Sequence, residues 1–358
     1  MRIIFLVPYP LFESPSQRFR FEQYLSILDD RNVSFKIYSF LSLKGWRVLY
    51  TKGNTIFKVY YVVKGLVSRL KHLASASASS VDFVFIHREV APVGPAIFEW
   101  IIVKIFKKKI IYDFDDAIWL TDIENESRLV KFIRSRSKIA HICKLSYKTS
   151  CGNKHLVDFA LQFNANSIVN PTTIDTSSHH IPIKNSISKH NQLVRIGWTG
   201  SHSTLKYLKD IEAIFQNFYN SEQIEFVIIS NHLPELSFPF RFIKWSKSSE
   251  IIDLGKIDIG LMPLPDNEWT RGKCGFKALQ YMAMGIPCIA SPVGVNSEII
   301  THGDNGYLAE SREDWTKFLT ILVNDSLLRE KLGKKGREKV EKCYSVSSNS
   351  LNFLSLFE

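Results

Sequence analysis

The stretch "WTRGKCGFKALQYMAMGIPCIAS", residues 269–291, contains an amphipathic helix followed by a short apolar strand. The apolar face of the helix is made of residues spaced three and four apart: Phe276, Leu279, Met282 and Ala283. The run "PCIAS" then follows as the strand. A helix that leads directly into a buried strand is typical of a parallel, doubly wound sheet. This stretch therefore predicts an α/β fold.

Strands and helices alternate on both sides of this stretch. The predicted strands are residues 2–7, 33–40, 82–87, 108–114, 144–150 and 166–170, and then 194–198, 224–230, 241–245, 257–263 and 287–291. A polar segment without periodicity separates the two series and indicates a linker. We predict two Rossmann-like domains, an N-terminal one over 1–170 and a C-terminal one over 193–344, with the linker at 171–192 and a C-terminal helix at 345–358.

Composition limits the class of protein. The five cysteines are an odd number without the spacing of a metal site, which predicts reduced thiols and a cytoplasmic location. The apolar opening is too short for a secretory signal, and the longest apolar run is about half of a membrane span. The sequence has no Walker A, HExxH, paired CxxC or GxSxG motif, so it supports neither a zinc site nor a hydrolase triad.

The positive charge lies in one half of the chain. Residues 1–170 hold 25 Lys and Arg against 14 Asp and Glu, whereas residues 171–358 hold 21 of each. The whole formal charge of +11 therefore belongs to the first half. Such a half suits an anionic membrane surface, a lipid-linked phosphate or nucleic acid, or it is only a solubilising face. Nucleic acid is disfavoured because no recognition helix or stacking motif is visible.

Residues 55–74 predict a helix with one apolar face, and this face has two interpretations. Its members are Ile56, Val59, Tyr60, Val63, Leu66, Val67 and Leu70, and they are bordered by Lys58, Lys64, Arg69 and Lys71. The pattern favours a helix that packs on the core. The alternative is a helix that lies on a membrane surface.

The start of the 275–284 helix has the features of an anion site. Arg271, Lys273 and Lys277 surround a loop whose glycines allow backbone amides to approach a ligand. The free N–H groups of a helix N-terminus attract anions, and charge-assisted hydrogen bonds strengthen the attraction. This pattern predicts a diphosphate site, and a solvated basic face is the alternative.

Further strand ends carry candidate binding residues. After the strand "PCIAS", the turn "SPVGVNSEII" supplies backbone amides at Gly294, Val295 and Asn296, and it places Glu298 in the first turn of the next helix. Glu298 either complements the helix dipole or accepts hydrogen bonds from a sugar or ribose hydroxyl. In "IGWTGSHSTLKYL", Gly200 allows a close approach and Ser201 can cap the helix.

In the first half, "YDFDDAIW" places Asp113, Asp115 and Asp116 at a strand end. Clustered carboxylates can hold a metal, act as a base, or simply turn the chain and cap a helix. The basic residues Arg18 and Arg20 fall in the first β–α loop, where an anionic group could dock.

The chain resembles the GT-B glycosyltransferases of family 4, which build bacterial surface polysaccharides. The resemblance is carried by "DIGLMPL", "CGFKALQYMAMGIPCIASPVGVNSEIITHGDNGYL" and "LLREKLGKKGREKVEKCYS", and more loosely by "IVNPTTID", "RIGWTGSHSTLKYL" and "IIYDFDDAIW". It implies two Rossmann-like domains that face a cleft, with the acceptor bound by the first domain and the nucleotide sugar by the second. It also implies a last helix that crosses back to the first domain.

The resemblance has gaps at individual residues. The family commonly has two glutamates eight positions apart, which fall here on Gly272 and Gln280. Gln280 still suits a ribose hydroxyl, and we expect Arg271, Lys273 and Lys277 to take over the diphosphate contacts. The family's histidine in the first domain is replaced around Asp115, so Asp115 or Asp116 is expected to position the acceptor hydroxyl or to contact the sugar.

The resemblance implies a glycosyltransferase that transfers a sugar from a nucleotide sugar to a glycan or lipid-linked acceptor. It implies retention at the anomeric carbon, with no metal or other cofactor. We expect Arg18 and Arg20 to bind the acceptor at the inner face of the plasma membrane. The missing glutamates leave an alternative, a catalytically silent partner subunit of another glycosyltransferase that binds a nucleotide or glycan.

Overall fold

A computed structural model describes residues 1–49, 51, 53–121, 127–182, 193–218 and 221–358. The chain divides into two compact units, each described by itself below. The first unit comprises Met1–Thr172 together with Ser350–Glu358, and the second comprises Thr173–Asn349. Of the predicted linker 171–192, residues 171–172 fall in the first unit and residues 173–182 in the second, and residues 183–192 lie outside the described residues.

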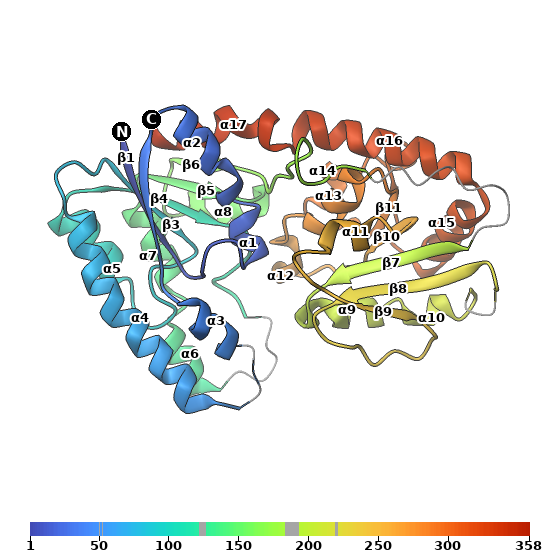
Figure 1. Cartoon of the computed structure of the whole chain (residues 1–358), viewed down its shortest axis with the longest axis horizontal. Coiled ribbons are helices and arrows are strands. Elements are labelled where there is room, and N and C mark those ends of the chain that lie inside the picture. Colours follow the sequence, from blue (N-terminus) through green and yellow to red (C-terminus); the bar gives the residue numbers. More distant parts are fainter. Residues whose placement is uncertain (50, 52, 122–126, 183–192, 219–220) are drawn as a thin grey trace. The chain divides into compact units, whose positions relative to one another are not determined.

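The first unit is built on a parallel sheet in the order β2-β1-β3-β4-β5-β6 (Figure 1). Its strands are β1 (Arg2–Val7), β2 (Ser34–Ser39), β3 (Phe83–His87), β4 (Lys109–Phe114), β5 (Lys148–Cys151) and β6 (Ser167–Val169). The central strands β1, β3 and β4 are almost wholly buried, which explains their continuous apolar runs in the sequence. All strands that the sequence predicted for this half are present.

The helices of the first unit depart from the sequence prediction in two places. They are α1 (Pro15–Arg18), α2 (Leu25–Asp30), α3 (Leu43–Leu49), α4 (Thr55–Ala76), α5 (Ile97–Trp100), α6 (Arg128–Arg134), α7 (Lys138–Leu145) and α8 (Lys154–Leu161). Between β1 and β2, where the alternation predicts a helix, the chain forms α1, a 3₁₀ turn at Glu22–Tyr24 and α2. Helix α3 was not predicted, because its short sequence contains Gly45 and has no clear helical spacing of apolar residues.

Helix α4 presents its apolar face outward, so the favoured prediction of a core-facing stripe was wrong. The exposed side chains are Ile56, Phe57, Val59, Tyr60, Val63, Val67 and Leu70. The buried side is instead made of Gly65, Arg69, Leu73 and Ala76. A buried arginine decides the orientation. Arg69 donates hydrogen bonds to carbonyl oxygens near the ends of β1 and β2 and after β3: Val7 at 2.5 Å, Tyr38 at 2.7 Å and Val90 at 2.8 Å.

The second unit contains a second parallel sheet, in the order β12-β11-β10-β7-β8-β9 (Figure 1). Its strands are β7 (Val194–Gly200), β8 (Ile224–Ser230), β9 (Arg241–Lys244), β10 (Ile259–Met262), β11 (Cys288–Ala290) and β12 (Tyr307–Leu308). Its helices are α9 (Leu205–Lys209), α10 (Glu212–Phe215), α11 (Glu250–Leu254), α12 (Glu268–Arg271), α13 (Phe276–Ala283), α14 (Asn296–Ile299), α15 (Arg312–Asn324) and α16 (Ser326–Cys343). The α/β class and the two Rossmann-like domains are confirmed.

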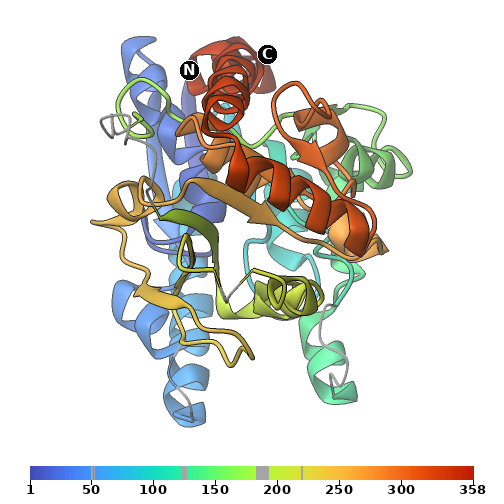
Figure 2. The same ribbon diagram turned by 90° about the vertical axis from the view of Figure 1, so that its right-hand side faces the viewer.

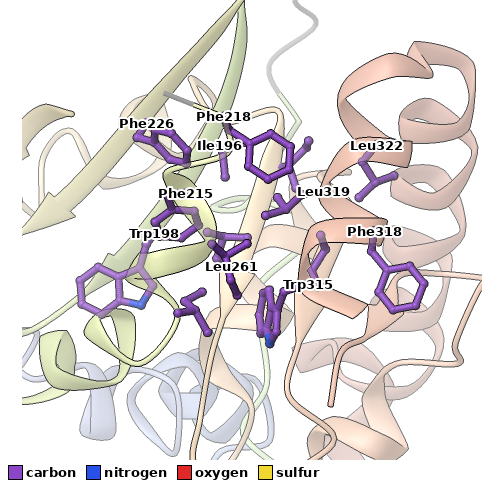
Figure 3. Packing of buried hydrophobic residues seen from close by; sticks show 14 of the residues in the cluster. Ile196, Trp198, Phe215, Phe218, Phe226, Leu261, Trp315, Phe318, Leu319 and Leu322 are labelled. Carbon is purple, nitrogen blue, oxygen red and sulfur yellow. The ribbon is translucent and has the colours of Figure 1, made fainter. Parts of the chain in front are cut away.

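The core of the second unit lies between its sheet and the helices α10 and α15. Aromatic rings fill it, as Figure 3 shows for Trp198, Phe215, Phe226 and Trp315. Helix α15 contributes Trp315, Leu319 and Leu322 from one face, as its helical spacing requires. This packing fixes β7, whose carboxyl end carries Gly200, against its neighbours in the sheet.

The last helix, α17 (Val346–Leu354), follows α16 in the chain. Its final part, with the turn Ser355–Phe357, packs in the first unit. Phe353 stacks on Tyr24 with ring centroids 4.3 Å apart and an interplanar angle of 6°. The predicted return of the C-terminal helix to the first domain is confirmed, although the crossing falls at residue 350 and not at 345.

None of the described helices combines the length and the hydropathy that a bilayer crossing requires. All five cysteines are free thiols, as the sequence predicted.

Candidate functional site

The loops that follow three neighbouring strands, β11, β10 and β7, carry the candidate binding residues of the second unit. These strands are parallel, so their carboxyl ends share one edge of the sheet. That edge is where doubly wound folds bind ligands. The three turns that the sequence singled out, at 200–201, 271–277 and 294–298, all follow these strand ends.

Lys277 lies directly over the end of β7. A Cβ atom at Gly200 would be 2.5 Å from the buried ring of Trp198 and 2.8 Å from Cε of Lys277, so glycine leaves room for both side chains. The ammonium nitrogen lies 5.5 Å from the ring centroid of Trp198. Tyr281, one turn later, accepts a hydrogen bond of 2.8 Å from the backbone N–H of Thr199. Helix α13 is thereby fixed to β7, and Lys277 is held at the strand end.

The glycine turns before α13 and α14 pack on one another. Gly275 has φ +68° and begins α13, and a Cβ there would be 2.2 Å from Cδ1 of Ile299. Gly294 has φ +55°, and a Cβ there would be 2.8 Å from the carbonyl oxygen of Arg271. Both positions need glycine, for the left-handed backbone and for the close approach. The predicted loops around 271–277 and 294–298 therefore form one contiguous surface.

The cations of the stretch are held by different neighbours. Arg271 donates to Asp266 through Nε at 2.6 Å and through Nη2 at 3.0 Å, and it also approaches Glu268 at 3.4 Å. The Nζ atom of Lys273 lies 4.8 Å from the ring centroid of Trp269. Arg271 already has carboxylate partners, so an incoming diphosphate would have to compete with Asp266 for it. Lys277, with its apolar support, is the best placed of the predicted cations.

Gln280 is buried and hydrogen bonded within the unit. Its exposed fraction is 3%, and its Nε2 lies 3.3 Å from Oε1 of Glu250 and 3.4 Å from Nε2 of His180. His180 belongs to the segment predicted as linker, and its carbonyl oxygen accepts a hydrogen bond of 2.7 Å from Arg337 of α16. Gln280 can therefore contact a ribose only if the segment around His180 moves, or if Gln280 contacts the ribose in addition to Glu250 and His180.

The remaining predicted residues of the second unit differ in exposure. Ser201 is exposed at the end of β7, and its Oγ lies 2.8 Å from Oγ of Ser203. Val295 is buried, and Asn296 points inward, donating to the carbonyl oxygen of Ser291 at 3.0 Å. The backbone N–H of Asn296 is also occupied, since it donates to the carbonyl oxygen of Val293 at 3.2 Å. Glu298 is exposed, and together with burial, the larger cause, it raises the pKa of Tyr344 to about 12.

In the first unit, Asp113 is the centre of a buried polar network. Its carboxylate pairs with Arg20, accepts from Oγ of Ser150 at 2.6 Å and lies 2.8 Å from Nδ1 of His87. Burial raises the pKa of Asp113, but Arg20 and His87 outweigh burial and hold the pKa well below its usual value. The carboxylate is therefore ionised and serves the packing of strand ends β3, β4 and β5.

Arg20 and Arg18 are buried, which corrects their prediction as acceptor-binding residues. Arg20 is 1% exposed and is occupied by Asp113 and by the carbonyl oxygen of Asn170. Arg18 is 8% exposed, and its guanidinium lies 4.9 Å from the ring centroid of Phe19. Arg18 ends α1 and Arg20 follows it, well beyond the end of β1, and no local pattern indicates that Asp113 draws Arg20 inward.

Asp115 and Asp116 share one cation, Arg88. Its Nη2 lies 2.7 Å from Oδ1 of Asp115 and 2.6 Å from Oδ2 of Asp116. Arg88 has φ +60°, a conformation that few residues other than glycine adopt. Burial lowers the pKa of Arg88, but the two carboxylates outweigh it and raise the pKa above its usual value. Within the described residues there is no group of three or more potential metal ligands.

A family model of known proteins matches part of the second unit. Residues 239–339, which include the Lys277 helix and the Gly294 turn, match the family model of glycosyl transferases group 1. This segment is similar to the glycosyl transferases group 1 domain. The matched range begins just before β9 and ends within α16, so the β7 end with Gly200 and Ser201 lies outside it.

Solved structures share the fold of the whole chain. Sucrose-phosphate synthase from Thermosynechococcus elongatus is similar over 100% of this chain and 98% of its own, with a TM-score of 0.71 and 12% identity. HepE of Anabaena, solved with UDP and glucose, is similar over 99% and 98%, with a TM-score of 0.66 and 11% identity. At such identities the likeness shows the fold alone, and that fold is GT-B.

A curated relative is similar over a shorter range. N-acetyl-alpha-D-glucosaminyl L-malate synthase of Bacillus anthracis is 30% identical over 118 residues, which is 32% of this chain and 30% of that protein. The match therefore spans less than a third of the relative's length.

The second unit has polar residues near α13 that the sequence did not single out. Glu250 and His180 surround Gln280, and Tyr281 ties α13 to β7. Glu250 begins a helix and His180 lies in an aperiodic segment, so no local pattern brings either of them to α13. Tyr281 was seen in the sequence only as a member of the polar face of the helix.

Proposed function

We propose that this protein is a glycosyltransferase that transfers a sugar from a nucleotide sugar to a glycan or lipid-linked acceptor in bacterial surface polysaccharide synthesis. The observation that carries the proposal is the shared edge of the second sheet, where Lys277 crosses Gly200 beside the glycine turns at 275 and 294. Helix N-termini and lysines stabilise the charge that develops on a diphosphate leaving group.

The reaction assigned to this site is transfer with retention, of the family 4 type and without a metal. In this proposal Lys277 and the amides of the turns at 275 and 294 contact the diphosphate, with Arg271 and Lys273 at its edge. Gln280 and Glu298 are the candidates for hydroxyl contacts on the nucleotide sugar. The ion-paired Asp115 and Asp116 would position the acceptor hydroxyl, since their charges are balanced by Arg88.

The test is the substitution Lys277→Ala, compared with Lys209→Ala. Lys209 is exposed at the end of α9, so Lys209→Ala removes the same charge from the same unit as Lys277→Ala. A thermal-shift screen against UDP, GDP, CDP, TDP and ADP and their sugars first identifies the donor. We then expect Lys277→Ala to lower turnover by about 100-fold, the scale of removing one transition-state donor. The melting temperature should change by only a few degrees.

Equal turnover in the two lysine variants would refute this role for Lys277. The anomeric configuration of the product, read by NMR, tests retention independently. Inversion would reject that part of the proposal.

A second candidate function is a silent partner that binds a nucleotide without transferring a sugar. Two observations favour it: Gly272 and Gln280 stand where the family has glutamates, and Gln280 is buried against Glu250 and His180. The purified chain separates the two functions. A silent partner would bind the nucleoside diphosphate but release no free sugar and form no product from the nucleotide sugar.

We also assign the protein to the surface of an anionic membrane. The support is the outward apolar face of α4, with Lys58, Lys64 and Lys71 on the same helix, and helix α6, which has no buried residue. The start of α4 (blue) and helix α6 (green) lie at the same end of the first unit in Figures 1 and 2. Helices with apolar and basic side chains of this kind lie in the membrane interface.

The membrane assignment predicts the behaviour of two exposed positions. Ile56 is 84% exposed and Phe132 is 83% exposed, so Asp at either position should leave folding unchanged. Each apolar side chain contributes about 1.5–3 kcal/mol when buried in lipid. The double variant should therefore bind phosphatidylglycerol vesicles at least 10-fold more weakly in cosedimentation. Leu327→Asp on α16, at a residue that is 77% exposed, is the control. A similar loss in the control, or no binding by the native protein, contradicts the assignment.

A further inference from the structure

A pocket opens beside the carboxyl end of β2 in the first unit, and the proposed function has not used it. Its volume is about 340 Å³, within the range of small-ligand sites. Its walls are the segment that follows β2, the residues Pro10 and Leu11 after β1, and one side of α4. Because β1 and β2 are parallel neighbours, the pocket lies at the carboxyl edge of the sheet.

The walls of the pocket are fixed by close packing. Gly65 of α4 leaves room for Phe40, since a Cβ there would be 2.5 Å from Cε1 of that ring. Gly45 of α3 likewise leaves room for Tyr61, since a Cβ there would be 2.9 Å from Cδ1 of that ring. One turn beyond Gly65, Arg69 binds α4 to carbonyl oxygens at the strand ends. The pocket is therefore part of the folded unit and does not depend on a mobile side chain.

The lining has hydrogen-bond donors and a cation but no acid. Its polar side chains are Ser39, Ser42, Ser68, Tyr61, Lys64 and His72, and none of the described lining residues is Asp or Glu. Among the described residues, no carboxylate pairs with Lys64. His72 is fixed by Arg69, whose Nη1 lies 3.4 Å from Nδ1 of the ring. Since a guanidinium can only donate, Nδ1 is the acceptor, and the neutral ring carries its proton on Nε2.

A cation surrounded by hydroxyl groups without a competing carboxylate suits a phosphate ester. Lys64 is one residue from Val63 and three residues from Val67, which both belong to the outward apolar face of α4. A ligand held by Lys64 would thus have its charged group in the pocket while an attached hydrocarbon chain follows that face of the helix.

We propose that this pocket binds the phosphate of a lipid-linked acceptor. The proposal rests on the proposed function and specifies where the first unit holds the acceptor. Lys64 pairs with the phosphate, and the serine and tyrosine hydroxyls of the pocket contact the phosphate or the sugar next to it.

The experiment measures binding to vesicles of phosphatidylcholine that contain or lack a polyprenyl phosphate. Neutral vesicles keep the general attraction of basic residues small. The variants are Lys64→Ala and Lys144→Ala, which remove the same charge from the same unit, but Lys144 is exposed on α7 and is not part of the pocket lining. We expect the polyprenyl phosphate to increase binding of the native protein. Lys64→Ala should lower that gain about 10-fold, whereas Lys144→Ala should change it less than twofold.

Equal losses in the two variants would show general surface attraction and overturn the proposal, as would no effect of the polyprenyl phosphate. Calorimetry with a soluble sugar 1-phosphate distinguishes the source. Tighter binding of the soluble ester than of the lipid would assign the pocket to a free phosphate ester and reject the lipid-linked ligand. Nucleoside diphosphate affinity, measured on the same variants, reports on the second unit, so failure of the donor site is distinguishable from failure of the pocket.

Discussion

At the scale of single residues, buried charges determine which surfaces remain available. Arg69 lies beneath α4 and donates to three backbone carbonyls, and burial lowers its pKa to about 9. Arg20 is similarly committed to Asp113. A guanidinium taken out of water is retained only with such partners, because an unpaired buried charge costs several kcal/mol. These residues therefore build the first unit and are not free for a ligand.

His72 gives the stability of the first unit a dependence on pH. Burial, and then the neighbouring Arg69, lower the pKa of His72 to about 4. The unfolded chain, with a pKa near 6.5, binds the proton more readily, so stability present above about pH 6.5 is lost as the pH falls toward 4. In urea denaturation between pH 7.5 and 5, the native protein should lose more stability than His72→Gln. Parallel pH profiles for the two proteins would show that His72 makes no such contribution.

At the scale of secondary structure elements, glycines set the distance between a helix and the segment on which it packs. In the second unit, α16 passes α13 (Figure 1). A Cβ at Gly333 would be 1.9 Å from the carbonyl oxygen of Gly285, whereas one at Gly336 would be 3.2 Å from the flexible side chain of Met282. The C-terminal end of the helix that carries Lys277 is therefore supported by α16, which approaches to backbone contact at Gly285.

Replacement of these two glycines by alanine should have different effects. Gly333→Ala forces two backbones apart, and overpacking of this kind costs about 1–3 kcal/mol. Gly336→Ala should be close to neutral, because Met282 can yield and alanine favours the helix by about 1 kcal/mol. The free energy of unfolding of the two variants, measured in guanidinium, tests the difference. Equal values would show that α16 adjusts without cost.

At the scale of the whole molecule, the first unit is assembled from both ends of the chain. Residues 350–358 complete it, and Phe353 and Phe357 reach the aromatic core that includes Tyr24, Phe83 and Phe85. The C-terminal residue also takes part, since its backbone carbonyl accepts a hydrogen bond of 2.9 Å from the hydroxyl of Tyr147. Folding of the first unit therefore depends on the last residues of the sequence.

Truncation of Phe353 to alanine tests this dependence. The ring is fully buried, and loss of a buried phenylalanine typically costs about 3–5 kcal/mol. Leu351, which is 70% exposed on the same helix, is the control, and Leu351→Ala should change stability by less than about 0.5 kcal/mol. Thermal unfolding followed by circular dichroism compares them. A small effect at Phe353 would mean that the C-terminal segment is only loosely attached.

The sequence by itself determined the α/β class, the two sheets and the loops that carry Gly200, Gly275 and Gly294. These features follow from local patterns: alternation of strands and helices, and glycines where the chain turns. The cations around α13 were also found this way, because their spacing places them at one helix start.

Only the tertiary structure decided which of these residues face a ligand. It took Arg20 and Arg18 into the interior, paired Arg271 with Asp266, covered Gln280 with Glu250 and His180, and turned the apolar stripe of α4 outward. The partners in these contacts lie as far apart in sequence as Arg20 and Asp113 or His180 and Gln280. Helical spacing defines the two faces of a helix, but which face is buried depends on the partners that the rest of the fold brings to it.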